Sequence, residues 1–233
     1  MLRSLVLLTV LSGLALPAAA EPVAADLELV LAVDASGSVD DQEFALQLGG
    51  IAAGFRDPKV RQAIGSGPFG RIAVELIVWA DHQVPKDASG WFLVSGDADA
   101  EAFARLVEGF PRRQNGATGI GEGVAAAVRA IEANGITGAR KTIDVSGDGR
   151  ETPPREYVVL MPQARIMALS SGITINGLAI VNEDAALLDY YRTEVRSGPD
   201  SFVMEAADYT DFTNAMRQKL IREIEYRPKL SEN

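Results

Sequence analysis

A short apolar run that ends in an aspartate is the feature that most constrains the fold of this chain. Residues 29–33 are all aliphatic, Asp34 follows them, and Ser36 and Ser38 stand at the next alternate positions. Such a run is typical of a buried parallel strand, and parallel strands deliver the residues after them to the carboxyl edge of the sheet. Three oxygen-bearing side chains within five residues at that edge predict a site for a hard divalent cation.

Other interpretations of this segment can be compared with the residues present. An EF-hand loop beginning at Asp34 requires Gly at its sixth position and Glu at its twelfth, where Val39 and Ala45 stand. An aspartyl-phosphate phosphatase requires a second Asp two residues after the first, where this chain has Ser36. A simple turn followed by a helix N-cap stays open, because Asp and Ser are favoured in both.

Two further segments carry residues suited to the same site. Residues 116–123 form a glycine-rich loop that contains Thr118 and runs into a helical stretch. Residues 141–147 form a second strand-like run, and Asp148 and Gly149 follow it. Together the three segments resemble the von Willebrand factor A-type (vWA) domain with its metal-ion-dependent adhesion site (MIDAS). The resemblance covers residues 26–226.

The signature of that family is an Asp-x-Ser-x-Ser motif after the first strand, then a loop Thr, then an Asp before Gly. All positions are filled here in the right order, by Asp34, Ser36, Ser38, Thr118 and Asp148. The chain is most similar to a bacterial secreted group of such domains, DUF1194-like, whose members carry stretches such as that at residues 174–180. The resemblance is specific for the fold and the site, whereas a fold alone does not determine biological role.

The resemblance also implies how these residues work. Ser36, Ser38 and Thr118 are expected to contact the metal, while Asp34 and Asp148 act largely through water. Mg²⁺ is the expected cation, with Ca²⁺ and Mn²⁺ as alternatives, because Mg²⁺ keeps several waters and prefers oxygen ligands. One water is expected to exchange for an Asp or Glu carboxylate of a partner protein. The predicted function is therefore metal-dependent protein binding.

A metal-dependent hydrolase at the same site is the alternative function, because a metal-bound water can be hydrolytic. The single histidine, His82, lies in the loop after a predicted strand, where we expect it to be solvated. The sequence contains neither a Gly-x-Ser-x-Gly elbow nor a Ser-x-x-Lys motif. We therefore predict that the protein is not an enzyme.

The two ends of the chain are expected to lie outside the domain. Residues 1–20 combine a basic start, an apolar core and an Ala-Ala-Ala end, which is typical of a signal peptide. This order predicts a periplasmic or secreted protein whose mature chain begins at Glu21 and has no membrane span. Residues 227–233 are expected to form a C-terminal tail.

Composition excludes several classes of site and partner. The absence of cysteine excludes thiolate zinc sites. The net charge of −10 becomes −11 when Arg3 is removed with the leader, and an acidic surface repels nucleic acid.

Strand-like and helix-like segments alternate along the chain. This alternation predicts one α/β domain, a three-layer doubly wound (Rossmann-like), mostly parallel sheet of vWA-like type. Further strands are expected at residues 71–80, 91–94, 173–181 and 201–204. Helices are expected at residues 41–55, 59–64, 97–110, 121–134, 155–170, 184–196 and 209–224.

Two acidic features of the sequence invite a second metal site. Asp97, Asp99 and Glu101 crowd a predicted helix start, where carboxylates are favoured without any metal. Asp144 lies inside a predicted strand, where we expect it to face a polar layer or to pair with Arg140 or Lys141. An auxiliary ligand role for Asp144 is the alternative. The segment 150–155 borders the predicted metal face and is expected to shape partner choice.

Overall fold

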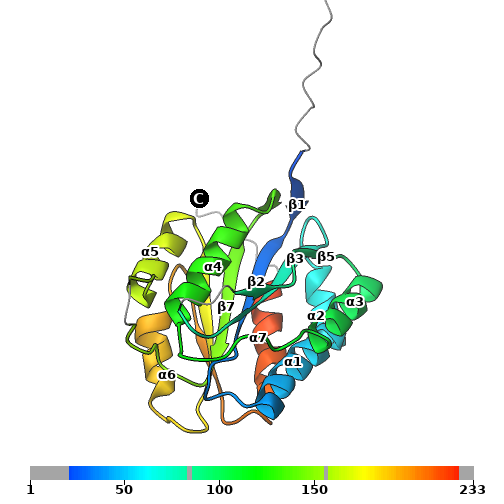
Figure 1. Ribbon diagram of the computed structural model, residues 1–233. Helices are drawn as coiled ribbons and strands as arrows, with labels where there is room; N and C mark the ends of the chain where they lie inside the picture. The colour runs from blue at the N-terminus through cyan, green and yellow to red at the C-terminus, as the bar shows by residue number, and fades with distance from the viewer. Residues whose placement is uncertain (1–20, 83–85, 155–156, 226–233) are drawn as a thin grey trace, which may run out of the picture.

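A parallel sheet covered by helices on both faces organises the part of the chain that the computed structural model describes, residues 21–82, 86–154 and 157–225 (Figure 1). The strand order is β4-β3-β2-β7-β8-β9, and β5 also pairs with β3. The sheet strands are β2 (Leu27–Asp34), β3 (Ile72–Trp79), β4 (Asp87–Ala88), β5 (Phe92–Val94), β7 (Lys141–Gly147), β8 (Thr174–Ile180) and β9 (Val203–Ala206). The helices are α1 (Asp41–Arg56), α2 (Pro58–Ile64), α3 (Asp97–Glu108), α4 (Ile120–Glu132), α5 (Met161–Ser170), α6 (Leu187–Tyr190), the π-helix η1 (Tyr191–Val195) and α7 (Phe212–Ile224).

The central strand β2 confirms the interpretation of the apolar run. All eight of its residues are buried, and it pairs in parallel with β3 on one side and β7 on the other. β8 and β9 continue the parallel arrangement, whereas the short β4 and β5 run antiparallel to β3. The carboxyl ends of β2 and β7 therefore lie side by side at one edge of the sheet, the lower edge in Figure 1.

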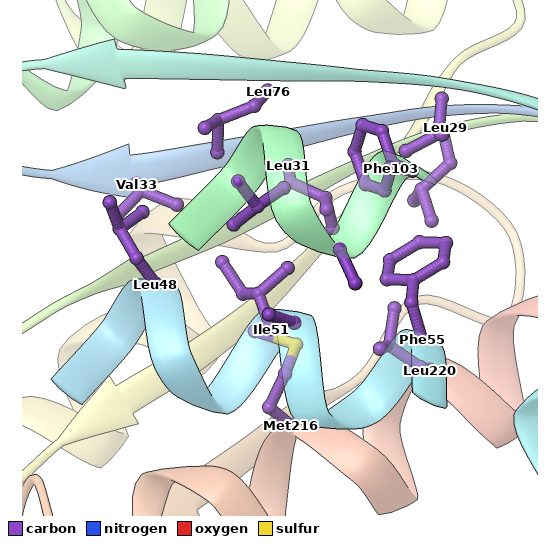
Figure 2. Close-up of a cluster of buried hydrophobic side chains, with 14 of the residues drawn as sticks. Leu29, Leu31, Val33, Leu48, Ile51, Phe55, Leu76, Phe103, Met216 and Leu220 are labelled. Atoms are coloured by element: carbon purple, nitrogen blue, oxygen red, sulfur yellow. The ribbon is translucent and has the colours of Figure 1, made fainter. Parts of the chain in front are cut away.

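Two apolar cores hold the helices against the sheet. On one face, alternate residues of β2 and β3 pack against α1, α2, α3 and α7. Figure 2 shows the centre of this core, where Leu31 of β2, Ile51 of α1 and Phe103 of α3 belong to the same cluster. On the other face of the sheet, the intervening residues of β2 and β3 pack against α4, α5 and η1. The three-layer α/β prediction is confirmed by this arrangement.

Several element boundaries differ from the expected ones. α5 begins at Met161, not at residue 155, because Pro162 is tolerated only in the first helical turn. Residues 184–196 do not form one helix: a turn precedes α6, and the chain then widens into η1. β9 lies two residues later than the expected strand, and α7 starts at Phe212, which leaves Tyr209 in the preceding loop.

A small parallel pair was not expected from the sequence. β1 (Val23–Ala25) pairs with β6 (Ile136–Gly138) beside the main sheet. The signal-peptide prediction concerns residues 1–20, and the predicted tail concerns residues 227–233; both lie outside the described residues. In the part of the chain that is described, no helix has the length and apolar character needed to cross a bilayer.

Candidate metal centre

The loop after β2 places the first three candidate residues. Asp34 is the last residue of β2, and its Oδ1 accepts a 2.7 Å hydrogen bond from the Ser36 backbone N–H, which folds the chain into a tight turn. Both side chains are fully buried, whereas Ser38 is exposed. The following helix starts with a capping box on Asp40, which fixes where the turn ends.

Asp148 joins this loop from the neighbouring strand. Its Oδ1 accepts a hydrogen bond from Ser38 Oγ at 2.7 Å, and Ser38 Oγ lies 3.3 Å from Ser36 Oγ. Its Oδ2 accepts a hydrogen bond from the hydroxyl of Tyr209 at 2.9 Å. Residues 110 positions apart in sequence are thus brought into direct contact because β2 and β7 are neighbours.

Thr118 reaches the same place from the loop before α4. A Cβ atom added at Gly149 would lie 3.4 Å from Thr118 Oγ1, so Thr118 stands against the residue that follows Asp148. The Thr118 loop is tied to the first loop by a 2.8 Å hydrogen bond from the Gly37 N–H to the Gly116 carbonyl. Gly116 has φ of +113°, a conformation that favours glycine at this crossing. All the predicted metal residues therefore lie at one edge of the sheet.

A close backbone approach supports the buried aspartate. A Cβ atom at Gly147 would lie 2.7 Å from Asp34 Oδ2 and 2.8 Å from the Tyr191 hydroxyl, so only glycine lets β7 pass here. Burial raises the pKa of Asp34 to about 7, and the negative charge of Asp148 adds to this effect, while hydrogen bonds from Ser36 oppose it. Two carboxylates held this close favour a positive charge between or beside them.

Within the described ranges, neither Asp34 nor Asp148 forms an ion pair with a lysine or arginine. Asp34 Oδ2 is buried and has no hydrogen-bond partner of normal geometry among the described residues. Two carboxylates and three hydroxyls form the kind of all-oxygen donor set that Mg²⁺ prefers. The donor chemistry and the unmatched charge thus fit a divalent cation.

The same donor set differs from a conventional metal cluster. The described residues contain no group of three or more His, Cys, Asp or Glu side chains that could hold a metal ion. A cation at this edge would therefore depend on the serine and threonine hydroxyls for direct contact. Neutral ligands of this kind leave most of the charge of the cation available to another group.

Sequence reasoning missed the residues that brace these loops. Arg112 donates to the carbonyls of Ser36 (3.3 Å) and Val39, and it pairs with Asp41 at 2.7 Å. Gln47 of α1 donates through Nε2 to the Asp34 carbonyl at 3.0 Å. Gln47 is a polar residue among the apolar positions of α1, and this pattern could have indicated a structural role from the sequence. Nothing in the local sequence marked Arg112 or Tyr209, because both act across long sequence separations.

The other sequence candidates lie elsewhere or face inward. His82 is buried, not solvated as we expected, and its Nε2 has no hydrogen-bond partner among the described residues. In the acidic cluster at the start of α3, Glu101 pairs with Arg56 and Asp99 accepts from Ser95. These contacts give both carboxylates partners within the protein, as an interpretation without a metal requires.

The segment after β7 is held by its own glutamate. Glu151 accepts from the backbone N–H groups of Gly121 (2.7 Å) and Met161 (3.0 Å), so one carboxylate caps the starts of both α4 and α5. Thr152 exchanges hydrogen bonds with Thr118 across the same region. Residue 155 of the predicted 150–155 segment lies outside the described residues.

Asp144 belongs to a separate buried cluster. It does not pair with Arg140 or Lys141. The Lys219 ammonium of α7 lies 2.7 Å from its Oδ1, because Asp144 points to the face of the sheet that α7 covers. Lys219 also contacts Glu223 at 2.5 Å, and Asn176 of β8 donates to Glu223 at 2.8 Å. The expectation of a polar layer is confirmed, and the partner is a residue far along the chain.

Comparisons with known proteins agree with this fold. A family model described as "Protein of unknown function (DUF1194)" matches residues 24–228. A search of curated proteins gave no significant match.

Solved structures share the fold at low sequence identity. The pilus adhesin SpaC from Lactobacillus rhamnosus GG is 15% identical with a TM-score of 0.59, over 88% of this chain and 31% of the adhesin. The vWF domain of the type V pili tip protein Mfa5 from Porphyromonas gingivalis is 15% identical with a TM-score of 0.53, over 92% of this chain and 100% of that domain. Proximal thread matrix protein 1 from the mussel byssus, solved with a zinc-occupied MIDAS motif, is 12% identical with a TM-score of 0.54, over 87% and 48%. These likenesses confirm the vWA-like fold. The chain spans less than half the length of the adhesin and of the mussel protein.

Proposed function

The chain belongs to the family described as DUF1194, and we propose that it is a protein-binding module that works through a divalent cation. The cation, Mg²⁺ in the first instance, is held by Ser36, Ser38 and Thr118 directly and by Asp34 and Asp148 through water. A carboxylate of a partner protein then takes one exchangeable position on the cation.

One observation carries this proposal. Asp34 and Asp148 are both buried at the carboxyl edge of the sheet and lack a basic partner in the described part of the chain, while three hydroxyls stand beside them. An uncompensated buried charge is costly, so a site of this kind favours the uptake of a cation. The mussel protein with a zinc-occupied MIDAS motif has the same fold, which supports the choice of site without extending its ligand to this chain.

The charge of the protein fits this mode of capture. At a net charge of −10 the chain repels acidic groups in general. A bound divalent cation reverses the field locally, because its direct ligands are neutral hydroxyls and the two carboxylates act through water. The partner is therefore an Asp or Glu side chain, or a chain terminus, presented on a protein surface.

The place of action in this proposal is outside the cytoplasm, in the periplasm or secreted. The leader-like order of residues 1–20 supports it. N-terminal sequencing of the protein from a periplasmic fraction should return Glu21 as the first residue. Recovery of a chain that still begins with Met1 in that fraction would be evidence against export by cleavage.

The experiment for the proposed function compares capture with turnover. Immobilised protein is exposed to periplasmic extract in Mg²⁺ and in EDTA, and the retained proteins are identified and then purified for direct titration. Binding should require Mg²⁺, should be lost in Ser36→Ala, and should survive in Asp97→Ala, an acidic residue at the exposed start of α3.

The variant Thr118→Ala separates binding of the cation from binding of the partner protein. We expect this variant to weaken partner binding more than Mg²⁺ binding, because Thr118 is the single contact supplied by the second loop. Metal-dependent hydrolysis of phosphate or carboxylic esters that is lost in His82→Ala, with no partner retained in Mg²⁺, would instead favour the hydrolase.

A further inference from the structure

Tyr209 connects the candidate metal centre to a distant part of the fold. It lies in the loop between β9 and α7, its ring is buried, and its hydroxyl donates to Asp148 Oδ2 at 2.9 Å. Ser38 Oγ donates to the other oxygen, Oδ1, at 2.7 Å. Both oxygens of Asp148 are therefore occupied by neutral hydroxyl donors that come from opposite ends of the sequence.

These two hydrogen bonds limit the ability of Asp148 to contact a cation directly. An oxygen that already accepts a hydrogen bond from a fixed donor is less available as a direct ligand to a cation. Ser38 can give its proton to Asp148 and still offer a lone pair outward, whereas Asp148 is held back from the cation. Resting on the function proposed above, we infer that Tyr209 is a positioning residue that keeps Asp148 from direct contact with the cation.

The loop that carries Tyr209 is rigid enough for this role. Asp208 Oδ1 accepts from the backbone N–H groups of Thr210 (2.7 Å) and Asp211 (2.9 Å), which forms a tight turn that includes the tyrosine. Phe212, the first residue of α7, packs so closely on α1 that a Cβ at Gly50 would lie 2.7 Å from its ring. Because both flanks are fixed, Tyr209 cannot readily follow Asp148 if the carboxylate swings outward.

Loss of the Tyr209 hydroxyl should change the affinity for the cation and the affinity for an external carboxylate in opposite directions. Without its donor, Asp148 Oδ2 is a buried acceptor that can be satisfied by contacting the cation directly. A direct carboxylate contact adds negative charge, so the cation is held more tightly. The same contact displaces a water and lowers the residual positive charge, so an external carboxylate binds more weakly. General damage to the site would weaken both.

The test uses Mn²⁺ as the metal and acetate as the carboxylate, so that no partner protein is needed. The full mature chain, Tyr209→Phe and the matched control Tyr190→Phe are compared; the Tyr190 hydroxyl lies near Glu151, not Asp148. Electron paramagnetic resonance gives the Mn²⁺ affinity, and water-proton relaxation gives the number of waters on the bound ion. Thermal unfolding in EDTA establishes that each variant is folded.

We expect Tyr209→Phe to hold Mn²⁺ with about one water fewer than wild type, because a direct carboxylate replaces it. Its Mn²⁺ affinity should be equal or higher, and its acetate affinity should fall about tenfold because the cation keeps less positive charge. Tyr190→Phe should match wild type in all three measurements.

Two results would overturn the role of Tyr209. One is an unchanged water count in Tyr209→Phe, and the other is a parallel loss of Mn²⁺ and acetate affinity. Failure of the wild-type chain to bind Mn²⁺ would overturn the proposed function as well, and it is recognised without reference to any variant.

Discussion

Two pairs of buried carboxylates lie in this fold, and they are balanced in different ways. Asp144 of β7 and Glu223 of α7 lie between the sheet and α7, and both contact the ammonium of Lys219, which is buried with them. Asp34 and Asp148 meet at the carboxyl edge and have hydroxyls around them, with no basic side chain in ion-pair contact within the described residues. The interior pair carries its own cation, whereas the edge pair is open to one from solution.

This difference shows how to separate a structural charge cluster from a binding site. Both clusters contain a carboxyl whose pKa burial raises to about 7, so the pKa alone does not distinguish them. What distinguishes them is the source of the positive charge and the access to solvent. The interior cluster is closed by α7, while the edge cluster includes the exposed Ser38 and the half-buried Thr118.

The largest effect is expected from removing the internal cation. Lys219→Met leaves Asp144 and Glu223 buried without a counter-charge, which should lower the free energy of unfolding by about 3–5 kcal/mol. Urea denaturation at pH 7 measures this loss. The control Lys59→Met removes an exposed lysine at the start of α2 and should change stability by less than about 0.5 kcal/mol. Similar values for the two variants would show that the interior cluster is not a structural ion pair.

The edge pair should respond to a cation added from outside. Binding to the folded state alone raises stability by about 2.7 kcal/mol at a hundredfold excess of cation over its dissociation constant. Thermal melts should therefore rise with Mg²⁺ or Mn²⁺ and return with EDTA. Asp34→Ala and Asp148→Ala should lose the rise, and Asp97→Ala should keep it. A rise that disappears in Asp97→Ala and persists in Asp34→Ala would place the metal at the start of α3.

Without metal, a substitution in the edge pair should affect stability in the opposite direction from a substitution in the interior cluster. In EDTA, Asp34→Asn should be as stable as wild type or more so, because it removes the repulsion between the two carboxylates. This is the reverse of the effect expected for Lys219→Met. A large loss of stability in EDTA, measured by urea denaturation, would mean that Asp34 is already balanced within the protein.

A smaller effect concerns pH and the interior cluster. Burial and the negative charge of Asp144 raise the pKa of Glu223 from 4.5 to about 7, although the positive charge of Lys219 acts in the opposite direction. Between these values the unfolded chain has lost the proton while the folded chain keeps it, so rising pH favours unfolding. Glu223→Gln keeps a neutral side chain throughout. The stability of wild type relative to this variant should therefore fall from pH 5 to pH 7, by at most about 1.4 kcal/mol per unit.

Denaturation curves for both proteins across this range test the sign of the shift. A stability difference that stays constant from pH 5 to pH 7 would mean that Glu223 is ionised throughout. A pKa lowered by Lys219 would instead move the difference in favour of wild type below pH 4.5, and not between pH 5 and pH 7.

The predictable parts of the fold are those written in local pattern. The apolar run before Asp34 and the capping residue Asp40 placed β2 and α1 to within two residues. The start of α5 was predicted at residue 155, too early, although Pro162 marks the first turn of the helix. The partner of Asp144 could not be found locally, since Lys219 is separated from it by most of the second half of the chain.

The candidate site divides in the same manner. The residues of the predicted metal set could be named because each follows a strand or opens a helix, and the topology brings those positions together. Tyr209 and Arg112 could not be named, because their contacts depend on how separate loops approach one another. Sequence pattern thus indicates which residues have the right chemistry, and the three-dimensional structure indicates which residues hold them in position.

The central claim is that the edge pair and its hydroxyls bind one divalent cation. Isothermal titration of Mg²⁺ into the mature chain, freed of metal by chelation and dialysis, tests it most directly, with Ser36→Ala as the comparison. Ser36 is fully buried beside Asp34 and carries no charge, so its replacement removes a ligand while both carboxylates of the pair remain. The account predicts about one Mg²⁺ per chain in wild type and a loss of at least tenfold in affinity in Ser36→Ala. Equal titration curves for the two proteins, or no heat of binding in wild type, would contradict it.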